Sequence, residues 1–490
     1  MTTAAEQPAL VDPRPPDPMR WRAAVFVLVA MALDLIDTTI IVVALPGLQS
    51  RLHTSGAVLQ WVVEGYTLTF ALFLVTAGRI GDMLGRKRVL LTGIGLFVAA
   101  SAACGAATGP AMLVVARVVQ GLAGALVVTQ GLSTFQVAFP ERERARVFGL
   151  FGGLSGLASV LGPVLGGLLI HANLFGWGWR PIFLINLPVG LVALAGVARY
   201  ARESRAPERR RLDVTGVLLV TAALLAVLYP LVQGRELGWP AWSFAVMAAS
   251  VPLFALFARH ERAKQRRDGF ALVQPALFGR RAFTTGLVML LFFFAGIGGF
   301  FFPFTFYLQS GLGFSALGAG LAVVPYALGA MVTASFSPLL AQRLGRVVLS
   351  AGIAVMAAGM LGLMFTVGRH GASTGVPVLV PSLVVVGLGM GLVVSPVVDL
   401  VLSGVPERDA GSASGVLNTA LQLGAAAGVA VLGVLFFGLL AGEVAPGAPD
   451  PARAAGFSRA FAHVLWYETG FLGVAFLLTF LLPARLRPRR

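Results

Sequence analysis

Long apolar runs, each near 20 residues, follow one another along almost the whole chain. A helix of about 20 apolar residues is long enough to cross the roughly 30 Å hydrocarbon core of a bilayer. We predict fourteen membrane-spanning helices, with limits near residues 22–45, 58–78, 89–107, 111–133, 146–170, 181–199, 213–232, 240–258, 283–308, 316–340, 347–367, 376–402, 411–440 and 461–483. The predicted fold class is therefore an all-α polytopic membrane protein, because such helices satisfy their own backbone hydrogen bonds within lipid.

The polar segments between these runs divide the chain. Basic loops near 199–212 and 259–282 separate spans seven and eight from six spans on either side. We predict an N-terminal six-helix bundle at 22–199, two inserted helices with their flanking basic loops at 200–282, and a C-terminal six-helix bundle at 283–483. The tails at 1–21 and 484–490 are expected to be cytoplasmic, and the first is expected to be disordered because it is rich in proline and charge. Gly162 in span five and Gly428 in span thirteen occupy matching places, which indicates two related halves of a transporter-like architecture.

The charges set the expected orientation. Most of the 37 lysines and arginines fall on the side of the spans that carries both termini. The positive-inside rule makes that side cytoplasmic. The net charge of +16 therefore reflects orientation and contact with anionic lipid, and we expect no binding to nucleic acid. With 57% apolar and only 12% charged residues, the chain has too little polar surface for a soluble globule of this length.

Little in the sequence indicates catalysis or a bound cofactor. The five histidines are scattered, mostly at span ends or in loops, and we expect them to be hydrated, so we predict no metal site and no cofactor. A set of nucleophile, base and oxyanion-binding residues is not apparent, which argues against a membrane enzyme. The single cysteine, Cys104, excludes an intrachain disulfide.

Four charged residues stand within apolar spans of the first half. Asp34 and Asp37 lie in span one, Glu64 in span two and Arg117 in span four. The last three lie at similar depths, roughly 9–13 Å from the outer ends at about 1.5 Å per residue, so we expect them to converge. A carboxylate at this depth is costly unless it lines a wet cavity or has a partner. We predict that Asp37 and Glu64 carry protons, that Asp34 assists and that Arg117 tunes them; a static ion network that only fixes helix packing is the alternative. Asp34 either belongs to this site or faces a neighbouring helix.

Other side chains have weaker signals. Trp61, Tyr66 and Tyr307 are candidates for stacking on an apolar or cationic substrate, with lipid contact or core packing as the alternative. Asp213 opens span seven and is predicted to be a helix N-cap. Glu468 stands near the outer end of the last predicted span and is expected to be hydrated.

The segment 78–88, between spans two and three, combines glycines with charges. Gly78 and Gly85 permit a tight turn. Asp82 can accept hydrogen bonds from backbone amides or an arginine, and the basic residues that begin at Arg86 anchor the turn at the membrane surface. Such a loop can hold two bundles together on one side and release them, so we predict that it takes part in gating.

This loop resembles the signature between helices two and three of the major facilitator superfamily. Residues 117–121 are similar to the fourth-helix motif of this family, and residues 162–167 to its motif associated with antiporters. Residues 37–46 and 179–188 are similar to motifs of its fourteen-helix drug:proton antiporter branch, which comprises multidrug efflux proteins. The resemblance implies the major facilitator fold, with two six-helix bundles and two extra transmembrane helices. It associates Arg117 with proton coupling. It also implies a bend at the interface between the halves, at Gly162, Pro163, Gly166 and Gly167.

Together, the residues and the resemblance predict a proton-coupled secondary active exporter. Its substrates would be amphipathic drug-like or antibiotic compounds, which it would move across the plasma membrane by antiport. The expected partners are a small-molecule substrate, protons and the lipid bilayer, and we expect a monomer. Two alternatives stay open: a proton-coupled uptake transporter of a small solute, and a non-transporting membrane sensor of the same fold.

Overall fold

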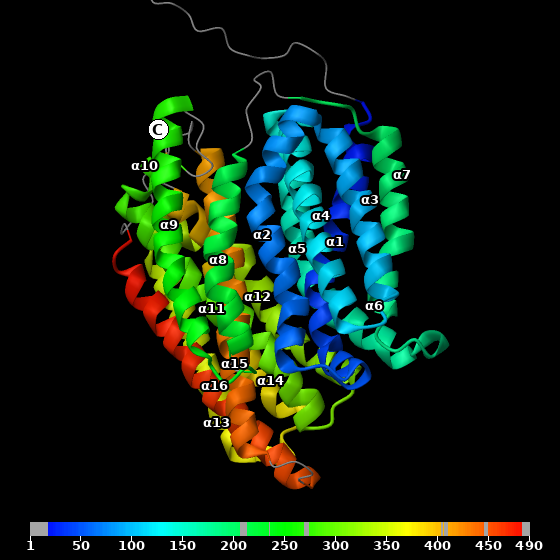
Figure 1. The fold of residues 1–490 in the computed structure, drawn as a ribbon, viewed down its shortest axis with the longest axis vertical. Coiled ribbons are helices and arrows are strands. Elements are labelled where there is room, and N and C mark those ends of the chain that lie inside the picture. The colour runs from blue at the N-terminus through cyan, green and yellow to red at the C-terminus, as the bar shows by residue number, and fades with distance from the viewer. Residues whose placement is uncertain are drawn as a thin grey trace, which may run out of the picture.

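The computed structural model describes residues 18–205, 213–234, 236–268, 274–402, 405, 410–444 and 449–482. Every regular element within these ranges is a helix, and fourteen helical segments are long and apolar enough to cross a membrane (Figure 1). The predicted fold class and number of spans are therefore confirmed. Most of the two predicted tails, at 1–21 and 484–490, lies outside the described residues.

The first half is a bundle of long helices joined by short turns. α2 begins after Ser55, whose hydroxyl accepts a hydrogen bond from the amide of Val58 at 3.4 Å, and α4 begins at Pro110, where a backbone amide would have no helical partner. The elements of this half are α1 (Arg20–Leu52), α2 (Gly56–Leu84), α3 (Arg86–Gly105), α4 (Pro110–Ala138), α5 (Glu141–Ala172), η1 (Leu174–Gly176), α6 (Pro181–Leu184) and α7 (Asn186–Tyr200).

α1 is longer than its apolar run indicated. It continues through Pro46 to Leu52, whereas the predicted span ended near residue 45. Leu45 and Leu48 are completely buried on either side of the proline, so packing holds the helix together where propensity alone would end it. As a result Asp37 lies deeper within its helix than the sequence indicated.

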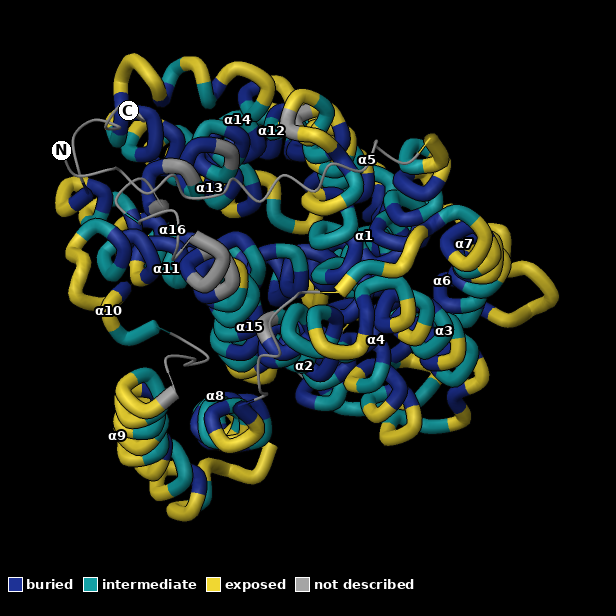
Figure 2. The backbone as a smooth tube through the Cα atoms, turned by 90° about the horizontal axis from the view of Figure 1, so that it is seen from above, coloured by how far each residue is buried: buried dark blue, intermediate teal, exposed yellow. Residues whose placement is uncertain are grey.

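Two further helices stand beside the halves. α8 (Val214–Gly234) and α9 (Ala241–Asp268) pack against each other as a hairpin, and Figure 2 shows the pair at the edge of the molecule. α8 contacts α2 and also α15 (Ala410–Glu443), so the hairpin touches both halves. α9 is the most exposed of the described spans, because only 11% of the residues in its apolar stretch are buried.

The second half repeats the bundle of the first. Gly162 of α5 packs so closely on α1 that a β-carbon would lie 1.9 Å from Thr39 Oγ1, and Gly428 of α15 packs as closely on α11, 2.0 Å from the carbonyl oxygen of Ala295. The matching glycines thus serve matching helix pairs. The other elements of this half are α10 (Pro275–Phe278), α11 (Arg281–Phe306), the π-helical turn η2 (Tyr307–Gly311), α12 (Ala316–Leu344), α13 (Val347–His370), η3 (Gly371–Ser373), α14 (Val376–Leu402) and α16 (Asp450–Thr479).

The apolar core shows where the halves meet. Leu45, Leu48 and Leu59, near the turn between α1 and α2, belong to one cluster with the buried side chains of the second half. Val27 and Phe135, near the other end of the bundle, belong to a cluster confined to the first half. The two halves are therefore packed together at the end that carries the α1–α2 turn.

Candidate functional site

A buried ion pair stands at the centre of the first half. Asp37 of α1 is fully buried, and its Oδ2 is ion-paired with Nη1 of Arg117 on α4, which is 1% exposed. Arg117 also donates from Nε to the carbonyl oxygen of Val62 on α2 at 3.0 Å. The predicted approach of Asp37 and Arg117 is confirmed. Since a buried charge is tolerated only when it is paired and hydrogen-bonded, the pair also fixes three helices relative to one another.

Two side-chain amides hold the other oxygen of Asp37. Oδ1 accepts hydrogen bonds from Gln120 Nε2 at 2.9 Å and from Asn186 Nδ2 at 2.8 Å. Both amides also reach the hydroxyl of Ser101 on α3, at 2.9 and 3.3 Å. Asp37 is therefore surrounded by hydrogen-bond donors from α4 and α7 in addition to its arginine, so both of its oxygens have partners.

The sequence did not single out these amides as site residues. Their signal was available, because Gln120 and Asn186 are polar residues within apolar spans. The missing element was the break in span six, which separates α6 from α7 at Ile185. Pro188 has no amide to bond the carbonyl of Leu184, so the helix breaks one turn earlier and Asn186 becomes the first residue of α7.

Asp34 belongs to the same site. Its Oδ1 accepts a hydrogen bond from the hydroxyl of Tyr66 on α2, and the guanidinium carbon of Arg117 lies 4.3 Å from the centre of the Tyr66 ring. Tyr66 thus links the second carboxyl group to the ion pair. The choice that the sequence left open for Asp34 is settled in favour of the shared site.

Close packing around Asp34 depends on a glycine in α4. A β-carbon at Gly124 would lie 2.1 Å from Asp34 Oδ1 and 2.7 Å from the Tyr66 hydroxyl. At Gly121, one turn earlier, it would lie 2.3 Å from the carbonyl oxygen of Tyr66. Both glycines allow α4 to approach α1 and α2 closely enough for the polar groups to meet.

Glu64 lies outside this network. It is fully buried on α2, and neither of its carboxyl oxygens has a hydrogen-bond partner among the described residues. The expected cluster of three charges is therefore an ion pair joined to Asp34, with Glu64 as a separate buried acid. An ionised carboxylate without donors is costly in such a place.

The three predicted aromatic contacts do not converge. Tyr66 is part of the network, but Trp61 packs towards Tyr229 of α8, with ring centroids 6.0 Å apart. Tyr307 stacks on Phe461 of α16 at 4.7 Å. Trp61 and Tyr307 therefore contact the hairpin and the second half, respectively, rather than a common site in this conformation.

The small residues of α5 lie where the resemblance implied. Gly166 packs on Ile40 of α1, while a β-carbon at Gly167 would lie 2.7 Å from the carbonyl oxygen of Ala316 on α12. The carbonyl oxygen of Pro163 meets Gly320 of α12 in the same way, at 2.3 Å. α5 is thus held between a helix of its own half and a helix of the other half.

Polar contacts cross between the halves at the same end. Gln309 Nε2 donates to the carbonyl oxygen of Val43 at 2.8 Å, and Gln60 Nε2 donates to that of Val429 at 3.2 Å. Both acceptors are backbone carbonyls within helices, so these bonds need no polar side chain on the accepting helix.

The segment between α2 and α3 forms a tight turn with an ion pair. Gly85 has φ +109°, and Arg86 Nη2 lies 2.8 Å from Asp82 Oδ1. Glu203, just after α7, accepts hydrogen bonds from the amides of Lys87 at 3.0 Å and Arg88 at 3.2 Å. The turn is therefore fastened within its own half by an acid that the sequence did not single out.

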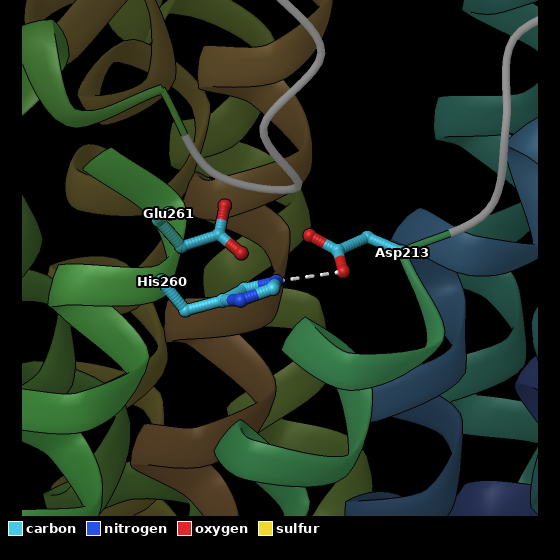
Figure 3. Close-up of side chains that lie close together, drawn as sticks. All are labelled: Asp213, His260 and Glu261. Carbon is cyan, nitrogen blue, oxygen red and sulfur yellow. Dashed lines mark hydrogen bonds and ion pairs between the residues drawn. The ribbon is translucent and has the colours of Figure 1, made fainter. Parts of the chain in front are cut away.

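A separate cluster of ionisable groups joins the first turn of α8 to the C-terminal part of α9 (Figure 3). Ligand atoms of Asp213, His260 and Glu261 lie within 4.8 Å of one another. Asp213 Oδ1 accepts from the Gly216 amide at 2.9 Å, which confirms the predicted N-cap, and interacts with His260 Nε2 at 2.9 Å and Lys264 Nζ at 3.3 Å. His260 was expected to be hydrated; its side chain is 27% exposed and also bonds this buried carboxylate.

The charges of this cluster are balanced by protein groups. Burial raises the pKa of Asp213, but the bonds from the Gly216 amide, His260 and Lys264 outweigh that effect and leave the pKa below its usual value. Asp213, His260 and Glu261 are residue types that hold metal ions. Lys264 already supplies positive charge at the same oxygen, so we interpret the cluster as an ionic link between two helices.

Two packed halves and a two-helix hairpin, with fourteen apolar spans among the described residues and an ion network buried inside the first half, define a polytopic membrane protein of the secondary-transporter class. A family model described as "Major Facilitator Superfamily" matches residues 27–429, so the chain belongs to that superfamily. The identification made from the motifs is confirmed.

Relatives of the chain are antibiotic transporters and resistance proteins. It is 43% identical to the "Probable actinorhodin transporter" of Streptomyces coelicolor, over 90% of this chain and 76% of that protein. It is 34% identical to the "Tetracenomycin C resistance and export protein" of Streptomyces glaucescens, over 94% and 83%. It is 32% identical to "Multidrug resistance protein Stp" of Mycobacterium tuberculosis, over 88% and 80%.

Solved structures agree on the fold. A bacterial homologue of the human lysosomal transporter Spinster matches with a TM-score of 0.67 and 16% identity, over 96% of this chain and 99% of that one. A bacterial homologue of the human peptide transporters PepT1 and PepT2 matches with a TM-score of 0.63 and 15% identity, over 94% and 98%.

Proposed function

We propose that this chain is a proton-coupled exporter of amphipathic drug-like or antibiotic compounds across the plasma membrane. The observation that carries the proposal is the buried group of Asp37, Arg117, Tyr66 and Asp34 inside the first half, with the acid of Glu64 close by on α2. Ionisable groups are rare at membrane depth and are typical of proton relays. The named antibiotic exporters among the relatives support the substrate class.

Orientation follows from the charge distribution. If both termini are cytoplasmic, as the positive-inside rule predicts, the joined ends of the halves face outward. The conformation described here is then closed to the outside, by α5 against α12 and by Gln60 against α15. Towards the cytoplasm, α5 is free of this contact. Added β-carbons at its Gly149, Gly152, Gly153 and Gly156 would meet no described atom within 4 Å beyond their own helix backbone.

The proposed mechanism is competition between proton and substrate. In the conformation open to the outside, the site takes up a proton and releases substrate. In the conformation open to the cytoplasm, it gives up the proton and binds substrate. Asp37 and Glu64 carry the protons. Arg117 stabilises the ionised form of Asp37, and Asp34 accepts from Tyr66, which packs on that arginine, so a change at one carboxyl group is felt at the other.

Inside-out vesicles test this proposal. With the vesicles energised by respiration, uptake of a fluorescent cationic dye and the internal pH are followed together for wild type, Asp37→Asn and the control Glu443→Gln. Glu443 forms an ion pair with Arg459 at 2.6 Å, at the end of α15. We expect dye uptake with proton release for wild type and control, and neither for Asp37→Asn.

Each other outcome has a definite meaning. If wild type moves no cationic dye, the broad multidrug function is refuted, and a narrow exporter or a non-transporting relative replaces it. If the substrate instead leaves the vesicles together with the protons, the protein works as an uptake transporter in the cell. If folded Asp37→Asn behaves as wild type, Asp37 is not the essential proton carrier, and Glu64 or Asp34 takes that role.

A further inference from the structure

A second buried acid lies in the C-terminal half. Glu468 of α16 is fully buried, and within the part of the chain that the structure describes neither carboxyl oxygen has a hydrogen-bond partner. The expectation of a hydrated residue near a helix end is wrong. α16 begins at Asp450, well before the apolar run. Its first turns were not recognised as helix in the sequence because they carry Arg453 and Arg459. Glu468 therefore stands 18 residues into a helix of 30.

Apolar and aromatic groups surround this carboxyl group. A β-carbon at Gly296 of α11 would lie 3.7 Å from Glu468 Cγ. Tyr326 of α12, only 6% exposed, packs on the same helix, α11. Phe301 packs edge-on against Tyr326, with ring centroids 5.2 Å apart. These neighbours exclude water from the acid.

In the described part of the chain, few ionisable groups stand on α16 and on the elements packed against it; one of them is Tyr307 of η2, which stacks on Phe461 of α16. Among the described residues, the nearest ionisable groups on its own helix are His463, Arg459 and the exposed Tyr467, and the other helices that pack on α16 carry theirs at their ends. These are Arg281 of α11, Arg369 and His370 of α13, and Glu443 of α15. On α12, which carries Tyr326, the described charge is Arg343 in the last turn.

α12, which carries Tyr326, also joins the halves. Gly320 of α12 meets the carbonyl oxygen of Pro163 on α5, and Tyr326 lies six residues further along α12, about 9 Å at the helical rise. Pro325 directly precedes Tyr326 and removes one backbone hydrogen bond there. Separation of α5 from α12 therefore moves Tyr326 and, through its contact with Phe301, acts on α11, the helix that contacts Glu468.

We propose that Glu468 is a second proton-binding site, which holds its proton while α5 and α12 are joined and exchanges it when they separate. The packing favours a proton over a larger cation, because the carboxyl group is completely enclosed and α11 is already in van der Waals contact with its side chain. This inference rests on the proposed antiport and adds a proton carrier in the half opposite to Asp37.

Infrared spectroscopy tests the site without transport. The C=O stretch of protonated carboxylic acids is recorded for the purified full-length protein in lipid, across a pH titration. We expect Glu468→Gln to lose part of the wild-type band and the control Glu443→Gln to keep it. A band unchanged by Glu468→Gln overturns the proposal.

Transport and stability separate a proton carrier from a packing residue. Glu468→Met replaces an acid without partners by an apolar chain of similar length, so it is expected to unfold at the wild-type temperature or above. Both variants should move fewer protons per substrate than wild type, while Glu443→Gln keeps the wild-type ratio. A wild-type ratio in both variants, or marked destabilisation by Glu468→Met, overturns the proposal. If wild type moves no substrate, the antiport itself fails, while the infrared band still tests Glu468 separately.

Discussion

Replacing Asp37 by asparagine breaks one specific part of the buried network. The asparagine oxygen can still accept the bonds from Gln120 and Asn186, because both reach Oδ1 of the aspartate. The ion pair between Oδ2 and Arg117 is lost, and an amide donor is placed against a guanidinium that is 1% exposed. Removing one partner of a buried pair costs about 3–5 kcal/mol, since it leaves the other charge buried without compensation.

The single cysteine reports this loss directly. Cys104 is completely buried, and its sulfur lies 3.6 Å from Gln120 Oε1, at the edge of the network. If labelling of Cys104 by a thiol reagent follows opening of the first half, a loss of 3–5 kcal/mol raises the labelling rate by roughly 100- to 4,000-fold. The assay is the labelling rate of the purified protein, with transport not required.

The control variant removes a more exposed ion pair, which also involves a residue of α1. Arg20 of α1 and Glu143 of α5 form an ion pair at 2.8 Å, with side chains 17% and 25% exposed. Glu143→Gln is expected to change the rate by no more than about fivefold, because such a pair contributes at most about 1 kcal/mol. If Asp37→Asn accelerates labelling no more than Glu143→Gln does, the Asp37–Arg117 pair does not hold the first half together.

Three further changes have equally definite outcomes. Gly124→Ala brings a β-carbon within 2.1 Å of Asp34 Oδ1 and should lower stability to unfolding by about 1–3 kcal/mol, whereas Gly95→Ala, which meets no atom within 4 Å, should be neutral or slightly stabilising; equal melting temperatures would contradict this. Gly167→Leu should force α5 and α12 apart, which spin labels at their joined ends would report as longer distances, and unchanged distances would show that the contact is not required for closure. The pKa of Asp213 is lower in the folded protein than in the unfolded chain. The stabilisation by its ionised form is therefore complete above the usual carboxyl pKa of about 4 and disappears as the pH falls through the lower folded value. The melting-temperature difference between wild type and Asp213→Asn should be constant near neutral pH and vanish in strong acid, and a pH-independent difference would refute the ionic link.

The sequence determined the fold class because its signals are local. Apolar runs of about 20 residues specify spanning helices wherever they occur, and the sequence predicted fourteen of them. The pairing of Asp37 with Arg117 was also within reach, since charges at similar depth in lipid must find partners. Motif residues such as Gly167 marked the contact between α5 and α12 because only small residues allow such an approach.

Tertiary structure decided which polar groups share a site. The break before Asn186, the glycine at 124 that lets Asp34 meet Tyr66, and the helical first turns that place Glu468 mid-helix depend on packing between segments far apart in the chain. Spacing along one helix gives depth and face, but the partner of a buried group is chosen by neighbouring helices. That is why the sequence located the acids, while only the fold shows that Asp37 is fully paired and that no described residue donates a hydrogen bond to Glu64 or Glu468.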